Sequence, residues 1–245
     1  MIDYGLLVSM ILAFGVPSML AWWWPLETVP GSALSDEPAG FLDVALGPAF
    51  AGLAVGRLTT LALDDPNSIG SLSDMLIIRS GVEFWPGVAA AAAGVVWAEH
   101  RAGLPRLSRL AALVPLAMVG YAAYEAACIF RDGCFGPDSD IGLQPPGVST
   151  RVFPIGWLMA AALIAAAVAV RALASRVRSP ALVVAAATVA VAGVRAIGSI
   201  WLPHVGDGLT RQHVTSIVIA ATAGVVLAVV AASAARRHQP SMPPT

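Results

Sequence analysis

The chain has no lysine, only two cysteines and few charged residues of either sign. Its 14 basic residues are therefore all arginines, and charged residues fill 12% of the 245 positions. So little charge excludes an ordinary soluble domain, whose charged fraction is about twice as high. We also expect no nucleic-acid partner, because the formal net charge is −1 and not strongly positive.

The motifs of common metal and nucleotide sites are missing as well. There is no HExxH motif, no glycine-rich phosphate loop and no zinc pattern of paired cysteines. Asp138 and Asp140 stand in a segment rich in glycine and proline, where a solvated turn is favoured over a metal site. Cys128 and Cys134 leave open either a disulfide or a small packed side chain at Cys128. We predict no metal site.

Apolar residues dominate what is present. They make up 58% of the chain, and the mean hydropathy is +0.78, values typical of an integral membrane protein. The first apolar segment has no basic leader and ends in three tryptophans, so we interpret it as a retained helix. We predict an all-α polytopic protein of seven transmembrane helices, at Tyr4 to Trp24, Val44 to Leu63, Phe84 to Ala98, Leu110 to Phe130, Val152 to Val170, Ala181 to Trp201 and Val214 to Ala235.

The arginines predict the orientation. Most of them gather in the loops after the third and fifth segments and in the tail, which should be cytoplasmic; these are Arg101, Arg106, Arg109, Arg171, Arg176, Arg178, Arg236 and Arg237. The amino terminus then lies outside and the carboxyl terminus in the cytoplasm. Residues 1–237 form one predicted domain, with outer loops at 64–82 and 131–151 and a flexible cytoplasmic tail at 238–245.

Arg57, Glu125 and Arg195 lie inside these apolar segments. Each stands five or six residues from the predicted outer end of its helix, a depth of roughly 8 to 9 Å at about 1.5 Å per residue. An ionisable side chain in hydrocarbon costs about 2.5 to 3.5 kcal/mol, so these three need partners. Two interpretations remain: an ion pair that joins helices, or a site for an anionic lipid headgroup. Gly52 and Gly56, spaced as GxxxG before Arg57, are consistent with close helix approach there, although alanine-rich membrane helices commonly carry this spacing without such a role.

Five segments, in order along almost the whole chain, share features with one known family. They read YGL at 4–6, AGLAVGRL at 51–58 followed by IRSGVEFWPG at 78–87, AYEAACIFRDGCFG at 123–136, VR at 194–195, and LTRQHVTSI at 209–217. These segments resemble the prolipoprotein diacylglyceryl transferase family. They correspond to its tyrosine-glycine-leucine opening, its glycine-arginine helix with the following glycine turn, its glycine-arginine signature, the arginine of its penultimate helix and the start of its last helix.

The resemblance implies a bacterial plasma-membrane enzyme that needs no cofactor. It would transfer the diacylglyceryl group of phosphatidylglycerol to the lipobox cysteine of a prolipoprotein. Cationic side chains at headgroup depth would hold the leaving phosphate. The positions that carry over are Tyr4 and Arg195 as catalytic residues, and Arg57, Arg79, Ser80, Gly81, Glu125, Gly136 and Gln212 as the headgroup site. His213, at the start of the last helix, is the candidate base near pH 7, although a solvated histidine is the simpler interpretation.

The chain departs from the family pattern at several polar positions. Trp85 stands where the family has a histidine, and Glu125 stands where its signature has an arginine, which reverses a charge. Cys128, Gly133 and Ser199 replace an asparagine and two glutamates, and Phe153 replaces the histidine before Pro154. An alternative is therefore a catalytically inactive or re-specialised paralogue that binds phospholipid or acts as a membrane scaffold.

Overall fold

The structure, a computed structural model, describes residues 4–24, 41–64, 66–67, 82–105, 107–130, 136–144, 149–202 and 209–237. Within these ranges the chain is built almost entirely of α-helices, so the predicted all-α class is confirmed. The helices are α1 (Tyr4–Leu20), α2 (Phe41–Asp64), α4 (Phe84–Arg101), α5 (Ser108–Ala126), α6 (Ile155–Ala174), α7 (Pro180–Gly198) and α8 (Arg211–Arg237), with a 3-10 helix η2 (Ala127–Phe130) and a strand β1 (Asp138–Leu143).

Each predicted apolar segment corresponds to one of these helices, although the ends differ. The fifth was expected from Val152, but α6 begins at Ile155. Val152 instead pairs with the two ends of β1, Asp138 and Leu143, and Pro154 stands directly before the helix. Proline suits a helix start because it has no N–H to donate. The predicted outer loop at 131–151 therefore contains a short strand.

Five helices are long and apolar enough to cross a membrane: α2, α5, α6, α7 and α8. α1 is apolar but shorter, with 17 residues. α4 is not among the five, and its last turn carries Glu99, His100 and Arg101. The chain thus has the character of a multi-pass membrane protein. Seven spans, and the side on which each terminus lies, stay predictions.

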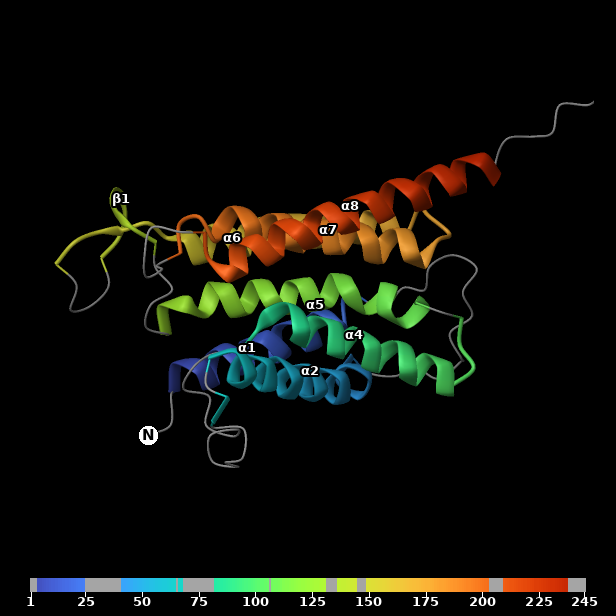
Figure 1. The fold of residues 1–245 in the computed structure, drawn as a ribbon, viewed down its shortest axis with the longest axis horizontal. Helices are drawn as coiled ribbons and strands as arrows, with labels where there is room; N and C mark the ends of the chain where they lie inside the picture. The colour runs from blue at the N-terminus through green and yellow to red at the C-terminus, as the bar shows by residue number, and fades with distance from the viewer. Residues whose placement is uncertain are drawn as a thin grey trace, which may run out of the picture.

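Helix α5 lies at the centre of the bundle. It packs against α1, α4, α6 and α7, and in Figure 1 it runs between the group α6, α7 and α8 and the group α1, α2 and α4. Small and branched side chains fill these contacts, among them Ala111 and Val119 of α5 against Ala167 of α6 and Val183 of α7. Because alanine leaves room for close backbone approach, these helices can pack tightly.

Helices α2 and α4 cross where glycines meet. A Cβ added at Gly52 would lie 2.6 Å from the carbonyl oxygen of Gly87, and one added at Gly56 would lie 2.7 Å from that of Glu83. The backbone N–H of Glu83 donates to the Gly56 carbonyl at 3.1 Å and to Thr60 Oγ1 at 2.9 Å. The GxxxG spacing read from the sequence thus marks a real helix crossing.

The opposite end of α4 is tied to the start of α5 by a buried carboxylate. Glu99 is 1% exposed, and its two carboxylate oxygens accept the backbone N–H groups of Leu107 and Leu110, each at 2.9 Å. The first N–H groups of a helix have no partner within the helix, and a negative charge there is favourable. Glu99 therefore fixes the connection between α4 and α5.

Two predicted segments lie mostly or wholly outside the described residues. The outer loop at 64–82 is described only at Asp64, at residues 66–67 and at Val82, and the tail at 238–245 is not described.

Candidate functional site

The two ends of the bundle differ in their polar residues. The ends of α4, α6 and α8 that carry arginines all lie toward one end of the bundle (Figure 1). Glu125, near the end of α5, and Arg195, near the end of α7, lie near the opposite end, where α8 and α4 begin (Figure 1). Antiparallel neighbours explain this grouping, because the last turn of one helix lies beside the first turn of the next. The candidate site occupies this second end.

Arg195 is the centre of the site. Its guanidinium donates to the hydroxyl of Tyr121 on α5 and to Oε1 of Gln212 on α8, the latter at 3.5 Å. The guanidinium carbon lies 3.9 Å from the ring centroid of Phe84 on α4, a cation–π distance. Three helices thus hold one cation. Its Nε is buried without a hydrogen-bond partner among the described residues.

Glu125 reaches Arg195 through Tyr121. Tyr121 and Glu125 are four residues apart on α5, so their side chains share a face, and the Glu125 carboxylate interacts with the Tyr121 hydroxyl. Within the described ion pairs, none joins Glu125 directly to Arg195. The tyrosine hydroxyl accepts from the cation, and its own proton is left for the carboxylate. The sequence-based expectation of a Glu125 partner is met in part by Tyr121.

A second polar pair lies one turn further along α7. Ser199 Oγ is 2.7 Å from Nδ1 of His213 on α8, and both residues are buried, at 7% and 9% exposure. Thr210 caps α8, because its Oγ1 accepts the backbone N–H of His213 at 3.1 Å. The interpretation of His213 as a simply solvated side chain is therefore wrong in this structure. Its backbone and its ring are each fixed by a hydrogen bond.

The rim of the site is held by ion pairs. Arg211, the first residue of α8, contacts Asp64 at the end of α2 at 3.1 Å and also Glu83, which precedes α4. Arg211 and Asp64 are exposed, so the pair is worth little energy by itself. It nevertheless places the beginnings of α4 and α8 and the end of α2 side by side.

Trp85, which stands where the resembled family has a histidine, has a structural role here. Its Nε1 donates to Oγ of Ser216 on α8 at 3.0 Å, and Ser216 is 1% exposed. Its ring packs edge-on against Phe84, with centroids 5.0 Å apart. Trp85 therefore links α4 to α8 beneath the Arg195 cluster and has no group that accepts a proton.

The other predicted site residues lie in different surroundings. Arg57 is buried in α2, directly after Gly56 at the crossing with α4. Tyr4, at the start of α1, is 74% exposed, and no described contact joins it to Arg195. Gly136 donates its N–H to the carbonyl of Phe153 at 2.9 Å and belongs to the loop before α6. Three residues of the predicted headgroup site lie outside the described ranges: Arg79, Ser80 and Gly81.

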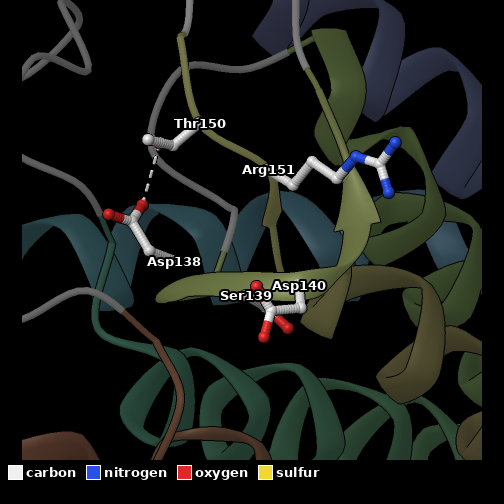
Figure 2. A pocket seen from close by; sticks show the side chains of 5 residues that line it. All are labelled: Asp138, Ser139, Asp140, Thr150 and Arg151. Atoms are coloured by element: carbon white, nitrogen blue, oxygen red, sulfur yellow. Dashed lines mark hydrogen bonds between the residues drawn. The ribbon is translucent and has the colours of Figure 1, made fainter.

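An open pocket lies beside the strand β1 and is separate from this site. It is lined by Asp138, Ser139, Asp140, Thr150 and Arg151, and Figure 2 shows the Arg151 guanidinium pointing away from both carboxylates. Thr150 Oγ1 donates to Asp138 at 3.0 Å. No group of three His, Cys, Asp or Glu side chains with metal-site geometry occurs in the described part of the chain.

Cys128 is buried, at 2% exposure, against the start of α6. Its possible disulfide partner, Cys134, lies outside the described residues, so the pairing remains a prediction.

Reasoning from the sequence missed Tyr121, Phe84 and the partner of His213. Tyr121 had a usable signal, because it precedes Glu125 by four residues on one helix face. Ser199 follows Arg195 by the same spacing and so shares its face. The pairing of Ser199 with His213 had no local signal, because it depends on how α7 packs against α8.

No protein-family model matches the chain, and a search of curated proteins finds no match.

Proposed function

We propose that the chain is a membrane enzyme of the diacylglyceryl transferase type, acting on phosphatidylglycerol and a prolipoprotein. The observation that carries the proposal is the placement of Arg195 one turn from the Ser199–His213 pair at one end of an apolar bundle. A phosphate-binding cation and a proton acceptor side by side are what such a transfer requires. The resemblance of five sequence segments to that family supports the same reaction.

The reaction defines a role for each group. The thiol sulfur of the lipobox cysteine attacks the glyceryl carbon that carries the phosphate; a C–S bond forms, the C–O bond breaks, and glycerol phosphate leaves. Arg195 stabilises the charge on the leaving phosphate. His213 accepts the thiol proton. Arg57 and Arg79 are the further cations of the headgroup site in this proposal.

The setting of the proposal is the bacterial plasma membrane. We propose seven spans, an outer amino terminus and a cytoplasmic carboxyl terminus, which places Arg195 in the outer half of the bilayer, where the secreted precursor arrives. The apolar helices support the membrane location, and the arginine-rich end supports the direction. Alkaline phosphatase fusions after Arg171 and after Trp201 test it: only the second should be active, and the reverse pattern would contradict the orientation.

The decisive test is complementation in bacterial cells depleted of their own diacylglyceryl transferase. Mass spectrometry of a reporter lipoprotein should show a diacylglyceryl thioether with the wild-type chain and with Arg151→Ala, a matched control because Arg151 is exposed at the same end. Arg195→Ala should abolish the product. Unmodified reporter with a folded, inserted wild-type chain would reject the proposed transfer, and full activity in Arg195→Ala would reject the role of that arginine.

A second candidate function has an observation of its own. Tyr121 connects Glu125 to Arg195, so the cation is already partly neutralised inside the bundle. This arrangement suits a paralogue that binds phospholipid or acts as a membrane scaffold without catalysis. A charge exchange separates the two: if Glu125→Arg unfolds the protein and the added Arg195→Glu restores folding, the polar layer is structural. If Glu125→Arg folds and raises reporter lipidation, the layer is a headgroup site.

A further inference from the structure

The Ser199–His213 contact indicates which nitrogen of the imidazole carries the proton. Ser199 Oγ makes two short contacts: 2.9 Å to the backbone carbonyl of Ala196 and 2.7 Å to His213 Nδ1. A carbonyl oxygen only accepts, whereas a hydroxyl has one proton to donate. If the hydroxyl donates to Ala196, its contact with the imidazole is satisfied only when Nδ1 carries a proton and donates to Oγ. Both groups are buried, so leaving either contact unmade is unfavourable.

We infer that Ser199 is a positioning residue that holds neutral His213 in the Nδ1–H tautomer, which leaves Nε2 as the proton acceptor. This inference rests on the proposed function only for what Nε2 then does, which is to take the thiol proton. Among the described residues, no hydrogen bond reaches Nε2. The second nitrogen of an imidazole is set by the hydrogen bond that the first one makes, so a fixed Nδ1–H defines an available lone pair on Nε2.

The geometry of the backbone supports a fixed ring. Thr210 accepts the His213 N–H, which sets the first turn of α8, and α7 and α8 pack along their length. Arg195 and Ser199 stand four residues apart on α7 and face Gln212 and His213 respectively. The same pair of helices therefore places both the cation and the proton acceptor. Ser199 contacts the imidazole of His213 directly, and this contact orients the ring.

Nitrogen NMR of the full chain, labelled with 15N in its histidine rings and held in phosphatidylglycerol nanodiscs at pH 8, tests the inference. The chain has four histidines, and the ring-nitrogen signal pair that His213→Gln removes belongs to His213. In the wild-type chain that signal should show a protonated Nδ1 and an unprotonated Nε2. In Ser199→Ala it should shift to the Nε2–H form, and Ser199→Thr, which keeps the hydroxyl, should restore it. Ser175→Ala removes a comparable serine bond to a helix carbonyl and should leave the signal unchanged.

A protonated Nε2 in the wild-type chain, or a signal that Ser199→Ala does not move, would overturn the inference. The measurement uses no precursor, so failure of the transfer assay leaves it intact, and failure here leaves the transfer assay to be judged separately. Where lipidation is active, Ser199→Ala should lower the maximal rate by less than the roughly 100-fold to 10,000-fold that a general base contributes. KM for the phospholipid should not change, and Ser199→Thr should recover the rate.

Discussion

Gly52 provides the sharpest test of how the site is positioned. An alanine there would place its Cβ 2.6 Å from the carbonyl oxygen of Gly87 and 3.1 Å from the Cβ of Ala91, whereas ordinary contacts begin at 3.4 Å. Neither neighbour is the end of a flexible side chain, so α2 and α4 must separate. Overpacking of this kind costs about 1 to 3 kcal/mol. Gly47, on the same helix, has nothing within 4 Å of an added Cβ and is the matched control.

Comparing Gly52→Ala with Gly47→Ala isolates the contribution of packing to the free energy of unfolding. Alanine is favoured over glycine in a helix by about 1 kcal/mol, and this gain is common to both variants. We therefore expect Gly52→Ala to be about 1 to 3 kcal/mol less stable than Gly47→Ala. Unfolding by SDS in mixed micelles, followed by circular dichroism, measures the difference. Equal stability of the two variants would refute the close crossing. The separation would also move Arg57, which follows Gly56 at the same crossing, so reporter lipidation should fall in Gly52→Ala and not in Gly47→Ala.

Three further changes test the polar contacts. Tyr121→Phe and Glu125→Gln should be non-additive by about 0.5 to 1.5 kcal/mol in a double-mutant cycle of unfolding, because the hydroxyl interacts with the carboxylate; additive effects would contradict that link. Glu99→Gln should lower the free energy of unfolding by about 1 to 3 kcal/mol and speed hydrogen exchange at the two amides it accepts; unchanged exchange would exclude the cap. Arg211→Ala should cost less than about 1 kcal/mol, and high salt should remove the difference; a larger, salt-independent loss would show a packing role.

The exact start of α6 shows where reasoning from the sequence fails. Apolar length alone extends the segment back to Val152, but that residue is drawn into pairing with β1. Pairing with the strand outweighs local hydropathy here, because backbone groups must be hydrogen-bonded somewhere. α1 also ends earlier than expected, at Leu20, and a turn follows that carries the tryptophans.

The sequence by itself determined the helices and the place of the charged side chains along them. Long apolar runs favour helices, because a helix satisfies the hydrogen bonds of its own backbone in hydrocarbon. Counting along each helix then placed Glu125 and Arg195 near one end. The GxxxG spacing of Gly52 and Gly56 predicted a close contact, although not that Gly87 would be its partner. Periodicity within one helix is local, so it can be read from the chain.

Only the tertiary structure decided which side chains meet. Tyr121 stands between Glu125 and Arg195, and Ser199 lies against His213, because α5, α7 and α8 pack in one particular rotation about their axes. A small rotation of a helix would direct the same residues toward lipid, and its hydropathy would barely change. Long-range packing of small residues sets that rotation, which is why the partners of the candidate site follow from the fold and not from spacing along the chain.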